Sequence, residues 1–233
     1  MRPAVAAAPA VLLCASLLGA APAEGDALPD RMADPGPGRQ LITAVAPTAA
    51  ATTGTVTWWD RRDGRWVRAG SAPARFGADG LVEGAARTQG TDTTPTGLFP
   101  LPYAFGVKAA PPGTTYAYRP VREDSWWCQD NASRAYNRWT EPRAADCRAR
   151  QAEHLVSYGQ LYAHALVIGF NYRTPVRGRG AGVFLHVRGA GPTAGCVSVP
   201  EDAMRRILRW ARARGRPHIA VGTASGPTAI TRY

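Results

Sequence analysis

Hydrophobic and polar positions alternate in short runs along most of the chain, a pattern typical of strands. Residues 55–59 and 65–67 flank Asp63 and Gly64 and predict a β-hairpin closed by these two turn residues. Gly and Pro recur through residues 73–102, which suits short strands and turns. Four later apolar runs predict buried strands, at residues 161–170, 181–187, 194–199 and 218–221.

One segment, residues 200–214, has helical periodicity. Pro200 and two acidic residues open it, as favours a helix N-terminus, and Gly215 ends it. Its apolar positions fall on one face, at Met204, Ile207, Leu208 and Ala211. We therefore expect a mainly β (β-rich α+β) domain with one main helix near the C-terminus.

The N-terminal region has the pattern of a secretory signal. Arg2 precedes an Ala/Leu/Val-rich stretch, and residues 21–23 read Ala-Pro-Ala, an A-x-A cleavage site. We expect a signal peptide at 1–23, a Pro/Ala/Gly/Thr-rich linker at 24–53, a catalytic domain at 54–222 and a C-terminal tail at 223–233. An uncleaved membrane anchor is the alternative; otherwise we expect no stable membrane insertion after cleavage.

The four cysteines divide into three kinds. Cys14 would leave with the signal, and Cys128 and Cys147 enclose a polar segment that we expect a disulfide to close outside the cytoplasm. Cys196 then stays unpaired in an exported protein, which makes it a candidate reactive thiol; the alternative is a buried, inert cysteine.

The chain is basic, with a net charge of +11 in 233 residues, and nearly all of its positive charge is arginine. Together with the signal, the absence of a nucleic-acid-binding motif favours anionic wall polymers or phospholipid surfaces as partners over nucleic acid. Neither H-x-H nor H-x-x-x-H spacing occurs, so we expect no metal site.

The most informative segment joins the apolar runs at 183–187 and 194–199 through Gly- and Pro-containing turn residues. If these runs pair antiparallel about Gly191, His186 lies opposite Cys196. This register divides the side chains cleanly between two faces, because a slip by one residue would move polar groups into the apolar face. One face would hold Val183, Leu185, Val187, Val197 and Val199, and the other Phe184, His186, Cys196 and Ser198.

A thiol beside an imidazole can act as a nucleophile and its base. His186 would take the proton of Cys196, and the sulfur would attack a carbonyl. Gly195 would let a substrate backbone come close, and the N–H groups of Gly195 and Cys196 would hold the oxyanion. The carbonyl of Val187 is our candidate for orienting His186. The remaining histidines, His154, His164 and His218, are weaker candidates.

At these residues the chain resembles the L,D-transpeptidase catalytic domain (YkuD-like) family. The family has a strand histidine, a Gly-containing loop and a Ser/Thr-x-Gly-Cys stretch, which here are His186 and Thr193-Ala194-Gly195-Cys196. The upstream residues 94–100 also resemble the family's T-P-x-G-x-F segment, and the likeness extends over roughly residues 54–222.

The resemblance implies a curved mixed sheet or sandwich and a cysteine nucleophile that acts on peptidoglycan stem peptides. The thioester acyl-enzyme would be resolved by an amine, which forms a 3–3 cross-link. The family needs no cofactor or metal, works outside the cytoplasm in the cell wall, and its cysteine is acylated by carbapenems.

Two positions depart from the common family pattern. Ala194 stands where a histidine is usual, and Ser198 stands where an arginine is usual, two residues after the nucleophile. We expect substrate contacts from Thr193 and Ser198, with Arg179 or Arg188 replacing the missing guanidinium. The alternatives are an L,D-carboxypeptidase or amidase-type hydrolase and a non-catalytic, basic wall-binding module.

Overall fold

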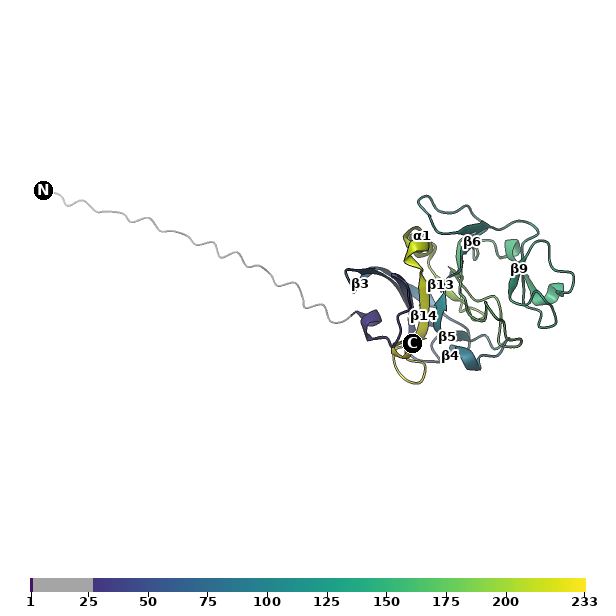
Figure 1. Ribbon diagram of the computed structural model, residues 1–233, viewed down its shortest axis with the longest axis horizontal. Coiled ribbons are helices and arrows are strands. Elements are labelled where there is room, and N and C mark those ends of the chain that lie inside the picture. The colour runs from purple at the N-terminus through teal and green to yellow at the C-terminus, as the bar shows by residue number, and fades with distance from the viewer. Residues whose placement is uncertain (2–26) are drawn as a thin grey trace.

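The protein is represented by a computed structural model that describes residue 1 and residues 27–233 (Figure 1). Apart from Met1, the predicted signal peptide lies outside the described residues. None of the described helices is both long and apolar enough to cross a bilayer.

The architecture is a large mixed sheet of 11 strands with one main helix, and it confirms the predicted fold class. Its spatial order is β4-β5-β14-β1-β2-β3-β13-β12-β11-β6-β7. The strands are β1 (Gln40–Ala46), β2 (Thr53–Arg62), β3 (Arg65–Arg75), β4 (Leu81–Glu83), β5 (Thr94–Pro100), β6 (Ala104–Gly106), β7 (Tyr118–Pro120), β11 (Ala165–Val167), β12 (Phe184–Val187), β13 (Val197–Val199) and β14 (His218–Thr223).

The predicted hairpin is confirmed as β2 and β3, which pair antiparallel over their full length. Asp63 and Gly64 form the turn with φ of 49° and 82°. Positive φ at both residues is what a two-residue turn needs to match the twist of its strands.

The predicted linker is wrong in its second half, because residues 40–46 form β1 near the middle of the sheet. β1 pairs parallel with β14 and antiparallel with β2. Both of its faces are almost completely buried, so the sequence shows no polar–apolar alternation there. The second half of the predicted linker is instead a central strand.

At the other end of the chain, the predicted tail is docked, with Ile230 buried and the Tyr233 hydroxyl bonded to Thr96 and Glu83.

The main helix, α1 (Glu201–Trp210), is shorter than predicted and lies near β13 and β14 in Figure 1. Ala211 is already extended, and Gly215 ends a separate short turn. The predicted apolar face is confirmed, since Met204, Ile207 and Leu208 are fully buried. The short 3₁₀ helices are η1 (Leu28–Arg31), η2 (Gly84–Ala86), η3 (Ala149–Gln151), η4 (Leu155–Tyr158), η5 (Ala213–Gly215) and η6 (Ile230–Arg232).

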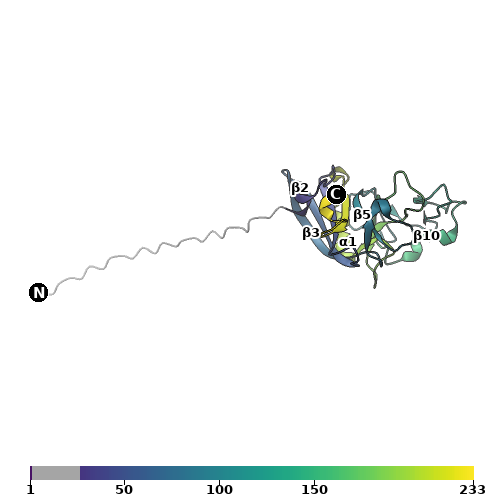
Figure 2. The same cartoon turned by 90° about the horizontal axis from the view of Figure 1, so that it is seen from below.

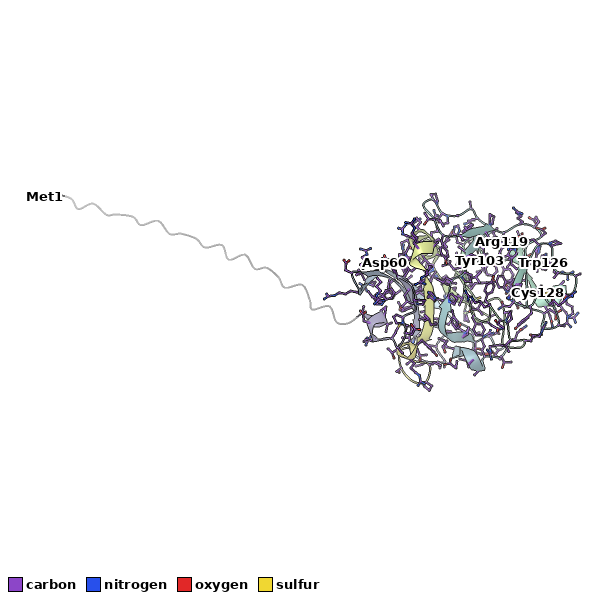
Figure 3. All side chains as sticks on the ribbon, viewed as in Figure 1. Met1, Asp60, Tyr103, Arg119, Trp126 and Cys128 are labelled. Carbon is purple, nitrogen blue, oxygen red and sulfur yellow. A yellow bond between two sulfur atoms is a disulfide. The ribbon has the colours of Figure 1, made fainter. Side chains whose placement is uncertain are left out.

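A second, three-stranded sheet is built by the polar segment between the two paired cysteines and its flanks. It has the order β10-β8-β9, with β8 (Trp126–Cys128), β9 (Arg138–Thr140) and β10 (Ala152–His154). Figure 2 shows β10 at the end of the molecule away from β2 and β3, and Figure 3 shows Trp126 and Cys128 there, far from Asp60. The predicted disulfide between Cys128 and Cys147 is present.

The predicted antiparallel pairing of the site strands is wrong, because β12 and β13 pair parallel. Leu185 lies beside Val197, and His186 lies beside Ser198 rather than Cys196. The connecting segment 188–196 turns back along the sheet, where Thr193 bonds with the backbone of Phe76 and Ala78 just after β3. This return brings Cys196 to the start of β13, next to the start of β12.

The division of side chains between two faces is nevertheless the predicted one. Leu185, Val187, Val197 and Val199 belong to the large core that α1 covers. Phe184 and Cys196 pack with a second apolar cluster that includes Phe105, Trp127 and Tyr162. The strand pair is therefore buried on both faces, between two separate cores.

Removing the disulfide should destabilise the second sheet. Cross-linking residues 19 apart should stabilise the fold by about 3 kcal/mol through the lost entropy of the unfolded chain. We therefore expect a Cys128→Ala/Cys147→Ala variant to unfold at lower denaturant by that free energy. Non-reducing peptide mapping should link Cys128 to Cys147; a link from Cys196 to either would contradict the assignment.

Candidate active site

Cys196 is held at the start of β13 by a dense set of hydrogen bonds. Its carbonyl accepts the hydroxyls of Thr193 (2.6 Å) and Thr94 (3.3 Å). The Phe184 N–H points at its sulfur (3.3 Å), and the thiol reaches the carbonyl of Gly182 (3.5 Å). Thr94 begins the T-P-x-G-x-F segment, so this upstream motif supports the nucleophile loop directly.

His186 is buried on β12, and its tautomer is fixed by the main chain. Its Nδ1–H donates to the carbonyl of Val187 at 2.8 Å, the orienting contact that the sequence suggested. Nε2 is then the basic nitrogen. Burial lowers the pKa of His186, against a smaller raising effect of the Val187 and Leu161 carbonyls. The imidazole is therefore neutral at neutral pH and able to accept a proton.

The two residues meet in one pocket of about 570 Å³. Both line it, and both belong to the same face of the strand pair. No hydrogen bond joins the Cys196 sulfur to the His186 ring in the described part of the chain, because the parallel register offsets them along the strands.

The thiol is neutral at rest. Burial, with a smaller contribution from the negative charge of Glu153, raises the pKa of Cys196 to about 12, against the lowering effects of the Phe184 N–H and Arg87. The site therefore holds a thiol and a neutral imidazole rather than a preformed ion pair. The proton must leave the sulfur as it attacks.

Arg87 is a component of the site that sequence reasoning missed. This buried arginine lines the pocket, and its charge favours the Cys196 thiolate. Its Nε donates to the Thr93 carbonyl (2.8 Å) and its Nη1 to the Arg179 carbonyl (3.1 Å). It lies in an ordinary polar loop after β4, so no pattern marks it.

Two glycines make room for this guanidinium. A Cβ at Gly180 would lie 1.7 Å from Nη1 of Arg87, and one at Gly195 would lie 2.7 Å from its Nη2. Both glycines have strongly positive φ, 118° and 121°, where other residues are strained. The open side of Gly195 thus faces Arg87, and not the substrate backbone that we expected.

The predicted substrate-binding residues are only partly brought together. Thr193 lines the pocket, although its hydroxyl is occupied by the Gly195 N–H and the Cys196 carbonyl. Arg179 and Arg188 are not among the lining residues, and Arg179 contributes only its carbonyl, to Arg87. Ser198 is fully buried outside the pocket, and its hydroxyl has no partner within residues 27–233.

Glu153 is a second component that the sequence did not reveal. It lies on β10, and its carboxylate lines the pocket while accepting hydrogen bonds from the Tyr162 hydroxyl (2.7 Å) and the Gln129 amide (2.6 Å). Its neighbour His154 stacks on Trp126 away from the pocket lining and has a packing role. In the described chain, no cluster of His, Cys, Asp and Glu has the arrangement of a metal site.

A known protein family has a sequence model that covers both Cys196 and His186. The sequence model of the L,D-transpeptidase catalytic domain (YkuD) family matches residues 49–227. The chain belongs to this family. The match contains Thr94, His186 and Cys196, and it begins close to the predicted domain boundary at residue 54.

Two solved structures match most of this L,D-transpeptidase-family chain but share little sequence with it. One is Bd1075 of Bdellovibrio bacteriovorus, at 16% identity and a TM-score of 0.38, covering 78% of this chain and 47% of that one. Another is L,D-transpeptidase 1 of Mycobacterium tuberculosis, at 14% identity and a TM-score of 0.33, covering 79% of this chain and 62% of that one. The chain thus spans about half to three-fifths of these proteins. No curated protein matches it.

The electrostatics of the thiol predict opposite effects of its two charged neighbours. At pH 8, Glu153→Gln should speed alkylation of Cys196 by iodoacetamide by roughly 3–30-fold, because it removes the charge that raises the pKa of the thiol. Arg87→Gln should slow the reaction. Asp92→Asn, which removes a carboxylate from the same lining, is the matched control. Equal rates in all four proteins would contradict the assigned environment.

Proposed function

We propose that this protein is an exported cysteine acyltransferase of peptidoglycan that forms 3–3 cross-links between stem peptides. The observation that carries the proposal is the placement of Cys196 and His186 in one pocket, with the Nδ1–H of His186 bonded to the Val187 carbonyl. That bond leaves Nε2 as an acceptor for the thiol proton. Membership of the L,D-transpeptidase family supplies the substrate class.

In the first half-reaction, the sulfur of Cys196 attacks the carbonyl carbon of the L-centre of the third stem residue. His186 takes the thiol proton during the attack and passes it to the nitrogen of the leaving D-Ala. The bond to D-Ala breaks, and a thioester to Cys196 remains. The neutral thiol of Cys196 and the neutral imidazole of His186 suit this order of steps, because the proton moves only when substrate is bound.

The developing oxyanion needs a donor near Cys196. The Gly195 N–H is engaged with the Thr193 hydroxyl at 3.2 Å, so of the two predicted groups the Cys196 N–H is the stronger candidate. We assign the substrate carboxylate to Arg87, in place of Arg179 or Arg188. Arg87 is the arginine next to the thiol, and it replaces the family guanidinium that Ser198 lacks.

In the second half-reaction, an amine of a neighbouring stem attacks the thioester carbonyl and releases Cys196. Water in place of the amine gives an L,D-carboxypeptidase, which is the second candidate function. The two share every step up to the thioester, so the choice between them depends on what the pocket offers to the incoming nucleophile.

Three observations support the proposed location outside the cytoplasm. The N-terminal pattern resembles a signal peptide, the Cys128–Cys147 disulfide is typical of an oxidising compartment, and the family acts on the cell wall. The net charge of +11 would hold the protein to anionic wall polymers. A non-catalytic wall-binding module would use the same charge but would have no need of a partly buried thiol that shares a pocket with a buried base.

Substitution at the site separates an enzyme from a binding module. With tetrapeptide stems, Cys196→Ala should abolish D-Ala release, and His186→Gln should lower its rate by about 10²–10⁴-fold through loss of the base. Wall binding should persist in both. Ser198→Ala is the matched control at the unpartnered hydroxyl outside the pocket and should keep the wild-type rate within about twofold. Unchanged release in Cys196→Ala would show that the nucleophile is wrongly assigned.

A covalent probe tests the thiol independently of turnover. Incubation with a carbapenem should add the mass of the drug to the tryptic peptide that contains Cys196, since ring opening by the thiol yields a thioester. The Cys196→Ala protein should stay unlabelled. A folded wild-type protein that gains no mass would count against an accessible nucleophile.

A further inference from the structure

The second sheet contributes one wall of the pocket, and this wall carries the carboxylate of Glu153, which is bonded only to neutral groups. Glu153 is placed by β10, opposite Trp127 of β8, and it lines the same pocket as Cys196. Its two hydrogen-bond donors, Tyr162 and Gln129, are both neutral groups. Tyr162 also packs edge-on against the His186 ring at 5.4 Å, so the carboxylate is linked to His186 through one side chain and shares the pocket with Cys196.

This carboxylate has no cationic partner among the described residues. The other acidic groups of the second sheet do: Asp130 pairs with Arg148, Glu141 with Arg119 and Asp146 with Arg134. The chain holds 28 Lys and Arg against 17 Asp and Glu, yet none of the described ones reaches Glu153. A half-buried carboxylate with only neutral partners is poorly compensated, and a cation that arrives with a ligand would supply the missing charge.

From this placement we infer that Glu153 is the acceptor site for the second half-reaction: its carboxylate binds the primary ammonium group of the incoming stem peptide and removes one of its protons. The inference rests on the proposed function. It names a primary amine, not water, as the nucleophile for which the pocket is built.

Every proton of the step is accounted for, and one is released to solvent. The ammonium gives one proton to the Glu153 carboxylate, and the freed amine lone pair attacks the thioester carbonyl carbon. The C–N bond forms, the C–S bond breaks, and the sulfur leaves with its electron pair. The second proton of the nitrogen passes through His186 to the sulfur and restores the thiol, and Glu153 loses its proton to solvent.

The protonation behaviour of Glu153 suits this role. Burial raises the pKa of its carboxyl to about 7, against the lowering effect of the Tyr162 and Gln129 donors. A base with a pKa near the working pH exchanges protons most effectively. The other titratable or charged groups that face the same pocket are Arg87, Asp92, Arg150, Tyr158, Tyr162, His186 and Cys196.

The competing explanation is structural, with Glu153 serving only to hold Tyr162 behind His186. The two explanations differ in which half-reaction depends on the carboxylate. Glu153→Gln keeps the shape and both hydrogen bonds, because the Tyr162 hydroxyl can accept from the new amide while Gln129 donates to its oxygen. It also removes the charge that opposes the thiolate, so the first half-reaction should not slow.

The experiment uses the purified full chain with tetrapeptide stems as both acyl donor and acceptor. Released D-Ala measures the first half-reaction, and the mass-resolved ratio of cross-linked dimers to trimmed tripeptides measures the choice of nucleophile. We expect Glu153→Gln to lower that ratio at least tenfold while D-Ala release stays the same or rises. Asp124→Asn, which removes an exposed carboxylate outside the pocket, should leave both unchanged, and the melting temperatures of all three proteins should agree.

The pH profile supplies a readout that a structural role would not move. The base must be ionised, so the ratio of dimers to tripeptides in the wild type should rise with pH through about 7. In Glu153→Gln this rise should disappear, leaving only the later increase from the deprotonation of the free amine itself.

Three results would overturn the inference. The first is a Glu153→Gln ratio within twofold of the wild type. The second is a parallel fall in D-Ala release and in the ratio, which would assign Glu153 a structural role. The third is a wild-type protein that releases D-Ala but forms only tripeptides, which would leave the thiol chemistry intact. No D-Ala release from the wild type would instead contradict the proposed function itself.

Discussion

The burial of one parallel strand pair on both faces is the constraint from which the rest of the site follows. β12 and β13 lie between the core under α1 and the aromatic cluster around Phe184, so each side chain belongs to one apolar environment or the other. A polar group in such a place must either be neutral or be bonded. Cys196 and His186 obey this rule: both are uncharged at rest, and the imidazole is bonded to the main chain. The thiol and the imidazole therefore carry no charge until the reaction begins.

The sequence was sufficient to assign side chains to faces but not to orient the strands. Alternation depends only on whether positions are odd or even, and pairing His186 with Cys196 or with Ser198 gives the same division. The direction of β13 depends on the path of residues 188–196 and on their bonds to Phe76 and Ala78, which are more than a hundred positions away. The family motif contains His186, Thr193 and Cys196, and the path of residues 188–196 brings all three to one pocket.

Other failures have similar causes. β1 does not stand out in the sequence because a strand buried on both faces carries no polar–apolar alternation. Arg87 and Glu153 were missed because each is an ordinary charged residue in a polar segment, and their approach to Cys196 is made by tertiary structure. The β2–β3 hairpin, the apolar face of α1 and the disulfide were predictable because turn residues, helical spacing and paired cysteines are local signals. Long-range electrostatics leave no such trace.

Arg87 lies in a slot between Gly180 and Gly195, and this slot affects how the site binds an anion. Its guanidinium is already desolvated and anchored to two carbonyls, with Gly180 and Gly195 closing in on its edges. An arginine on an open surface would have to give up water and rotamer freedom each time an anion arrived. Here that loss is incurred once, during folding. The positive field beside the sulfur therefore stands ready and unchanged from one turnover to the next.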